Sequence, residues 1–115
     1  MKSFFQSFVF AANGIQHAFV NERNFLIQAV VAGAVVILSW VLEITRVEWM
    51  VVLINIGLVL GFEMMNTCIE RICNLIHPQH SNLVKIIKDV AAAAVLLLAI
   101  MATICGLIIF IPKIL

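Results

Sequence analysis

The chain has 115 residues, of which 64% are hydrophobic and 11% are charged, and its formal net charge is +1. Soluble domains are closer to half apolar and a quarter charged, so these few charges cannot cover a folded core with polar surface. We therefore expect many apolar side chains to face lipid or other subunits. The near-neutral charge and the lack of a basic run argue against nucleic acid as a partner.

The first predicted element is an amphipathic helix over residues 4–20. Its apolar side chains recur at helical spacing, and polar residues including Asn13, Gln16 and His17 occupy much of the other side. A helix of this kind lies in the plane of a membrane surface. Packing on another protein surface is the alternative that the sequence leaves open. The apolar stretch after Lys2 is too short for a secretory signal.

Three apolar segments follow, at residues 26–42, 47–65 and 90–111, and we expect each to cross the membrane as a helix. At about 1.5 Å per residue, each is near the length that spans a hydrocarbon core of about 30 Å. Strands are excluded because three segments cannot close a barrel and unpaired backbone groups are not tolerated in lipid. The prediction is an all-α membrane protein with one domain, residues 1–115, comprising three transmembrane helices and the surface helix.

The basic residues predict the orientation of these spans. Five of them lie on one side of the membrane and two on the other: Lys2, Arg23, Arg71, Lys85 and Lys88 against Arg46 and Lys113. Because Lys and Arg are more frequent in cytoplasmic loops, we expect the N-terminus and the long link between the second and third spans in the cytoplasm.

Polar residues of the second span gather in one stripe. At about 100° per residue, the following residues fall on one face of a helix: Glu63, Asn66, Thr67, Glu70 and Asn74. Ionisable residues at membrane depth are costly and usually mark a functional site. Glu63 and Glu70 are two turns apart, about 10 Å along the axis, which is too far for both to hold one ion. This spacing suits a base near the lipid boundary and a metal ligand nearer water.

A second carboxylate for such a metal is available at the cytoplasmic mouth of the first span, where Glu22 stands. Magnesium is usually bound through one or two carboxylates together with substrate phosphates. A further polar cluster, Lys85, Lys88 and Asp89, precedes the third span. The two lysines can hold phosphates, but anchoring at the membrane boundary explains them equally well. The histidines and the three cysteines lack the spacing of metal ligands.

Two stretches, GFEMMNTCIERICNLI and KIIKDVAAAAVLL, resemble the bacterial diacylglycerol kinase and undecaprenol kinase family, as does NERNF at the entrance to the first span. The resemblance covers essentially the whole chain. It implies a homotrimer with sites between subunits, in the bacterial inner (plasma) membrane, and an active site that faces the cytoplasm. It also implies that the protein phosphorylates a lipid alcohol with ATP and magnesium.

The resemblance implies roles for individual residues. Glu63 is expected to be the general base that takes the proton from the lipid hydroxyl, supported by Asn66. Glu22 and Glu70 are expected to bind the magnesium–ATP complex. The nucleotide is further expected near these residues: Lys88, Asp89, Gln79, His80 and Ser81.

The sequence also departs from the family. Asn74 stands where many members carry Asp, and the N-terminal helix has Ser3, Phe10 and Ala12 where the best-known diacylglycerol kinases have Arg, Tyr and Trp. The segment Glu22-Arg-Asn-Phe25, the pair Glu48-Trp49 and the ending IIFIPK look more like the undecaprenol kinase branch. We therefore expect undecaprenol as the substrate ahead of diacylglycerol.

Two other functions compete with a lipid kinase. An intramembrane glutamate in a short chain is also compatible with a proton-coupled small membrane transporter. Such transporters normally have more spans or inverted repeats, which this sequence lacks. A purely structural membrane subunit is the third possibility, and it would tolerate apolar residues at Glu63 and Glu70.

Overall fold

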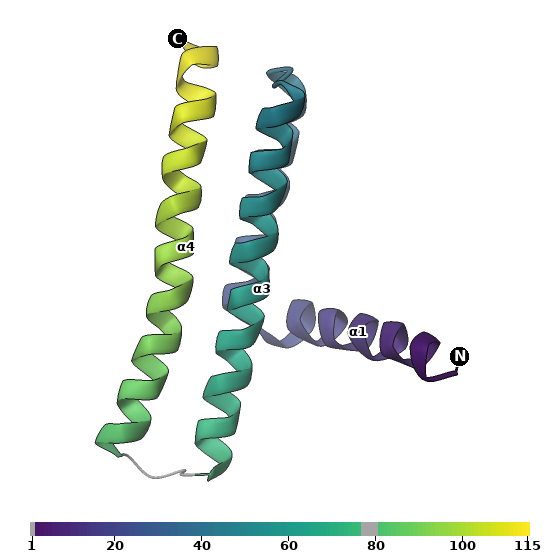
Figure 1. The fold of residues 1–115 in the computed structure, drawn as a ribbon, viewed down its shortest axis with the longest axis vertical. Coiled ribbons are helices and arrows are strands. Elements are labelled where there is room, and N and C mark those ends of the chain that lie inside the picture. Colours follow the sequence, from purple (N-terminus) through teal and green to yellow (C-terminus); the bar gives the residue numbers. More distant parts are fainter. Residues whose placement is uncertain (1, 77–80) are drawn as a thin grey trace.

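The structure is a computed structural model that describes the backbone of residues 2–76 and 81–115. Those residues form four α-helices (Figure 1), namely α1 (Lys2–Asn21), α2 (Arg23–Val41), α3 (Arg46–Ile76) and α4 (Asn82–Ile114). The last three are long and apolar enough to cross a membrane. The prediction of an all-α protein with three membrane-spanning helices and an N-terminal helix is confirmed.

The three long helices pack side by side with a small interior. α3 packs along α4, and α2 packs on α3. The buried apolar cluster consists of Ile44, Val52, Ile109 and Phe110, and most other large apolar side chains of these helices are exposed. Soluble proteins rarely expose contiguous apolar surface on this scale, because its contact with water is unfavourable. It is the surface that a transmembrane helix offers to lipid and to neighbouring helices.

The N-terminal helix stands apart from the other three. In Figure 1, α1 projects sideways from the long helices. The helical path breaks at Glu22, whose φ of −112° and ψ of 105° are extended. Across this break Phe19 and the buried Phe25 pack edge to face, with ring centroids 5.0 Å apart. α1 thus leaves α2 in the direction that a helix lying along the membrane surface requires.

Two helices run further than the predicted apolar spans. The predicted second span ends at residue 65, but α3 continues to Ile76, and the predicted third span begins at residue 90, but α4 begins at Asn82. Hydrophobicity marks where a helix leaves lipid, whereas the helix itself ends only where its backbone bonding ends. The extensions carry the polar residues and bring two polar helix ends side by side.

The opposite end of the molecule is closed by a tight turn between α2 and α3. Glu43 has a φ of 53°, which lets the chain reverse. The Thr45 backbone N–H donates to Glu48 Oε1 at 2.9 Å, and the Glu48 N–H donates to Thr45 Oγ1 at 3.2 Å. This reciprocal pair is a capping box that fixes the start of α3. Lys113 on α4 pairs with Glu48 at 3.1 Å and ties the two helix ends together.

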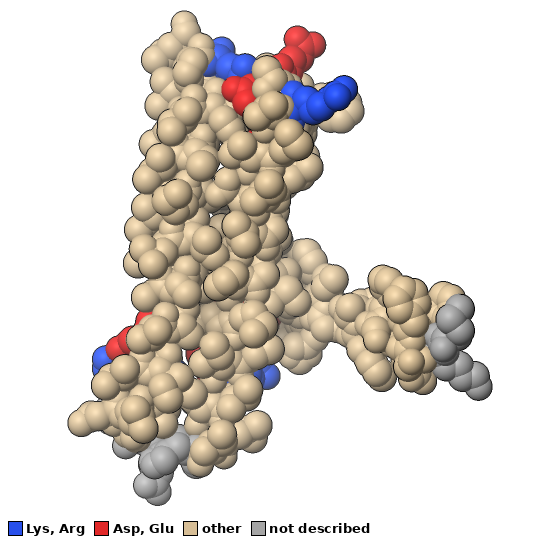
Figure 2. Space-filling model, in the orientation of Figure 1, with Lys and Arg blue, Asp and Glu red and all other residues tan. Residues whose placement is uncertain are grey.

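Charged side chains lie at the two ends of the long helices and leave an uncharged band between them (Figure 2). Such a band is expected for helices whose middle sections lie in hydrocarbon, where an exposed charge is costly. The polar residues considered below lie at the end of the bundle that carries α1, which we call the α1 end.

Candidate active site

The most deeply placed acidic residue is Glu63 on α3, which is 5% exposed. Gln28 on α2 donates a hydrogen bond from Nε2 to Glu63 Oε2 at 3.2 Å. One turn along α3, the Thr67 hydroxyl donates to the Glu63 backbone carbonyl at 3.1 Å. An ionised carboxylate is tolerated in a poorly solvated place only when it is hydrogen-bonded. The Gln28 amide supplies that bond from a neighbouring helix.

Asn66 and Glu70 follow on the same face of α3. Asn66 is 8% exposed, and its Nδ2 donates to Glu70 Oε1 at 3.5 Å. Asn66 Oδ1 is buried, and no described residue donates a hydrogen bond to it. Glu70 is exposed. A buried amide oxygen beside a carboxylate is therefore available to a ligand.

Glu22 reaches this face of α3 from the junction of α1 and α2. Its carboxylate forms an ion pair with Arg71. As the N-cap residue of α2, Glu22 makes no side-chain bond to its own helix, so its carboxylate is free to turn toward α3.

The polar start of α4 is joined to the end of α3. Lys88 Nζ donates to Asn74 Oδ1 at 2.5 Å, and Lys85 Nζ pairs with Asp89 at 2.7 Å. Ser81 caps α4 through its backbone carbonyl, which accepts from the Lys85 N–H at 2.9 Å. Asp89 is thus held by Lys85, while Lys88 keeps its positive charge opposite a neutral amide.

The predicted site residues fall into two groups in one chain. One comprises Glu22, Glu63, Asn66 and Glu70, and the other comprises Ser81, Lys88 and Asp89. The remaining predicted nucleotide contacts, Gln79 and His80, lie outside the described residues. Among the residues that are described, no three His, Cys, Asp or Glu side chains could hold a metal together. Any metal here would need ligands from elsewhere, such as substrate phosphates.

Two contacts of this site were not predicted from the sequence. In the sequence, Gln28 is one uncharged polar residue within an apolar span, and Arg71 is one of the basic residues that favour a cytoplasmic loop. The sequence does contain a hint of the Gln28 contact, because an amide within an apolar transmembrane segment often forms a hydrogen bond to a neighbouring helix. The partner itself depends on how α2 is rotated against α3.

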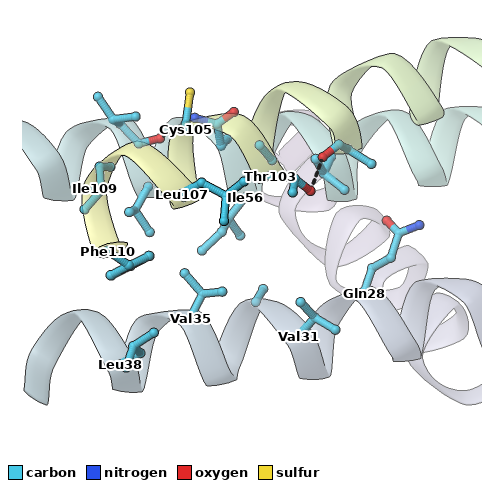
Figure 3. Close-up of a pocket in the computed structure, with 18 of the residues that line it drawn as sticks. Gln28, Val31, Val35, Leu38, Ile56, Thr103, Cys105, Leu107, Ile109 and Phe110 are labelled. Carbon is cyan, nitrogen blue, oxygen red and sulfur yellow. Dashed lines mark hydrogen bonds between the residues drawn. The ribbon is translucent and has the colours of Figure 1, made fainter. Parts of the chain in front are cut away.

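An apolar groove leads away from this site toward the opposite end of the molecule (Figure 3). It lies between α2 on one side and α3 and α4 on the other and has a volume of about 490 Å³. Its walls are mostly aliphatic, with Val31, Val35, Ile56 and Phe110 among the lining residues, and Gln28 lies at the end nearest Glu63.

The sequence is similar to those of known proteins. Residues 9–110 match the model of the prokaryotic diacylglycerol kinase family. The chain is 42% identical over 113 residues to the undecaprenol kinase of Bacillus subtilis, covering 98% of this chain and 92% of that protein. It is 36% identical over 110 residues to a diacylglycerol kinase of Synechocystis sp., covering 95% of this chain and 63% of that protein.

Both relatives carry the names of lipid kinases, which confirms the prediction that the chain is an enzyme that phosphorylates a lipid alcohol. Nothing in these similarities supports a proton-coupled transporter. The family match over residues 9–110 and the two relatives show that the chain belongs to the prokaryotic diacylglycerol kinase family.

Proposed function

We propose that this chain transfers the γ-phosphoryl group of ATP to the hydroxyl of undecaprenol, with diacylglycerol as a second acceptor. The observation that carries the proposal is the buried Glu63 carboxylate, hydrogen-bonded to Gln28 and followed along one helix face by Asn66 and Glu70. Along α3 these residues pass from apolar surroundings toward water. The reaction needs both environments, because the lipid alcohol comes from the membrane and the nucleotide from water. The 42% identical undecaprenol kinase supports the choice of lipid.

In this proposal Glu63 is the general base. Its carboxylate takes the proton of the lipid hydroxyl while the hydroxyl oxygen bonds to the γ-phosphorus and the bond to the ADP oxygen breaks. The products are the lipid monophosphate, ADP and a proton, which Glu63 passes on to water. Transfer of this kind depends mainly on in-line positioning and charge stabilisation, so a base and a few phosphate-binding groups are sufficient.

Magnesium is the proposed cofactor, and three oxygen donors of the chain fit it. They are the carboxylates of Glu70 and Glu22 and the buried Asn66 Oδ1, to which no described residue donates. Oxygen ligands of this type, few in number and completed by phosphates, suit magnesium. When bound, magnesium supplies neutralisation of phosphate charge. Arg71 keeps the Glu22 carboxylate turned toward α3.

The polar start of α4 is the proposed contact for the nucleotide. Lys88 carries a positive charge that suits a phosphate group, and the hydrogen bond to Asn74 fixes its position. Asp89, Ser81 and the neighbouring Gln79 and His80 are proposed to lie around the rest of ATP. Lys88 bonds to Asn74, which lies one turn beyond Glu70 on α3, so this proposed nucleotide contact borders the acidic residues of the same chain, and we propose that a second subunit closes the site.

We accordingly propose a homotrimer, in which the exposed apolar faces of α2–α4 pack between copies. The α1 end, with its nucleotide-binding groups, is proposed to face the cytoplasm across the bacterial inner membrane. Purified protein in detergent should then have a mass of three times 12.8 kDa by light scattering, after subtraction of the detergent.

The direct test is a phosphorylation assay on purified protein in mixed micelles with radiolabelled ATP. Undecaprenol and diacylglycerol are offered side by side, each with magnesium and with excess chelator. We expect both lipids to be labelled, undecaprenol with the higher kcat/KM, and no labelling with chelator. Absence of labelling of either lipid would refute the proposal, and a higher kcat/KM for diacylglycerol would refute the choice of lipid.

A further inference from the structure

Gln28 is the polar side chain that joins α2 to the buried glutamate of α3. It is half-buried, and its Nε2 donates to Glu63 Oε2 at 3.2 Å. The carbonyl oxygen of the same amide, Oε1, is buried, and no described residue donates a hydrogen bond to it. An unpartnered buried acceptor is costly and rare in folded proteins. Half of this amide is therefore occupied by Glu63 and half is available.

Other polar side chains of the long helices behave differently. Asn55 donates to the Val51 carbonyl at 2.8 Å, and Ser39 donates to the Val35 carbonyl at 2.7 Å. Each bond satisfies the side chain within its own helix, which is the common way to place a polar residue in a membrane span. Gln28 instead bonds across to Glu63, thirty-five residues away in the chain. An apolar side chain of similar size would fill the space at position 28 equally well, so packing does not explain the presence of an amide there.

An amide can bond to either protonation state of a carboxyl group. Its N–H donates to an ionised carboxylate, and after a half-turn of the amide its carbonyl accepts from a protonated one. Glu63 needs both partners in one reaction cycle, because it begins ionised and holds a proton after the transfer. The Gln28 N–H that is bonded to Glu63 Oε2 supplies the donor that the ionised form requires.

We propose that Gln28 is a positioning residue for the phosphoryl transfer. Its N–H holds Glu63 Oε2 so that Oε1 of Glu63 meets the lipid hydroxyl, and after the transfer the amide and the carboxyl group rotate so that the Gln28 carbonyl accepts a hydrogen bond from the protonated carboxyl of Glu63. The inference rests on the proposed role of Glu63 as the base. Gln28 itself neither gains nor loses a proton or electrons. Rotation of the amide accompanies the proton that passes from the hydroxyl to Glu63 and then to water.

The test is the near-isosteric substitution Gln28→Met, assayed for kcat and for KM toward ATP and lipid in mixed micelles. We expect kcat to fall about 10- to 100-fold, as for a misplaced catalytic group, while both KM values stay within about twofold. The matched control is Asn55→Leu, which removes an amide from the same groove and should leave all three constants within about twofold. Gln28→Met activity within about twofold of the unmodified protein would overturn the proposal.

A double-mutant cycle separates positioning from a structural role. In a Glu63→Asp background, where the carboxylate has been drawn back from Gln28, the additional Gln28→Met change should lower kcat by less than about twofold. The same fold loss in both backgrounds would overturn the proposal. If Gln28→Met does not fold, as judged by circular dichroism and elution volume, Gln28→Asn takes its place. That variant keeps the amide but shortens its reach, and it too should lower kcat without raising KM.

Assaying Glu63→Gln in the same experiment distinguishes the proposal that Glu63 is the base from the proposal that Gln28 positions it. Loss of activity in Glu63→Gln with full activity in Gln28→Met would leave the base in place and remove only the positioning role. Full activity in Glu63→Gln would instead remove the base, and with it the proposed function of the site.

Discussion

At the scale of single residues, the environment distinguishes the two acidic side chains of α3. Glu63 is 5% exposed and bonded to an amide, whereas Glu70 is exposed and bonded to Asn66. A poorly solvated carboxylate with one neutral donor suits proton abstraction. A solvated carboxylate beside an available amide oxygen suits a metal. We therefore propose two different roles for these two glutamates, which lie two helical turns apart.

Replacing Glu70 by Gln should raise the magnesium concentration that gives half-maximal activity by about tenfold or more, because loss of a residue that merely orients a metal ligand already costs about 10- to 100-fold in affinity, and Glu70 is proposed as a ligand itself. kcat should recover in part at high magnesium. The measurement is a magnesium titration of the kinase assay at fixed ATP. Glu48→Gln, at the opposite end of α3, is the matched control and should leave the titration unchanged. An unaltered curve for Glu70→Gln would remove Glu70 from the metal site.

At the scale of helices, the extensions of α3 and α4 beyond the apolar spans position the proposed nucleotide site. The contact between Asn74 and Lys88 links the two extensions directly. Because Asn74 is neutral, it fixes the lysine without cancelling its charge. This arrangement supports the proposal that Lys88 contacts a phosphate of the nucleotide.

Asn74→Ala should raise the KM for ATP about 3- to 10-fold, corresponding to the loss of about 1 kcal/mol from one hydrogen bond that positions Lys88, and leave kcat nearly unchanged. Initial rates at varied ATP measure this. The exposed Asn82 at the start of α4 provides the control substitution, Asn82→Ala. A fall in kcat at unchanged KM would contradict the positioning of Lys88 by Asn74.

The capping box at the start of α3 makes a separate prediction about stability. Thr45→Ala should lower the free energy of unfolding by about 1 kcal/mol, as for other N-cap substitutions. The measurement is unfolding of the purified protein by a denaturing detergent, followed by circular dichroism. Thr103→Ala is the control, because Thr103 only bonds to the Ala99 carbonyl of its own helix. Equal losses for both variants would contradict a specific cap.

The helices and the polar stripe were predictable, but the contacts between helices were not. Apolar length and helical periodicity are properties of one segment, so the spans and the shared face of Glu63, Asn66 and Glu70 follow from spacing alone. The Gln28–Glu63 and Glu22–Arg71 contacts depend on the rotation and depth of α2 against α3. Those are set by packing between segments, which periodicity does not encode.

At the scale of the whole molecule, the uncharged band between two charged ends defines how the chain sits in a bilayer. The sideways α1 marks one surface, and α3 and α4 extend past it on the side proposed to be cytoplasmic. The opposite surface carries the turn at Glu43 and the C-terminal end of α4. The orientation of the chain therefore determines on which side of the bilayer the proposed nucleotide and the lipid hydroxyl meet.

The orientation is tested by reporters fused after Leu115. Since three spans separate the two termini, alkaline phosphatase at this position should be active and green fluorescent protein should be dark. A reporter fused before α1 should give the opposite pattern and serves as the control. A fluorescent C-terminal fusion would place the α1 end outside the cytoplasm, where ATP is not available.

The account as a whole depends on Glu63 as the base, and Glu63→Gln tests this most directly. The substitution keeps the size of the side chain and its hydrogen-bonding capacity but cannot accept the hydroxyl proton. With purified protein, saturating ATP and undecaprenol, kcat should fall about 10²- to 10⁴-fold while the KM for ATP and the mass of the oligomer stay unchanged. A Glu63→Gln variant that retains the kcat of the unmodified protein would contradict the central claim.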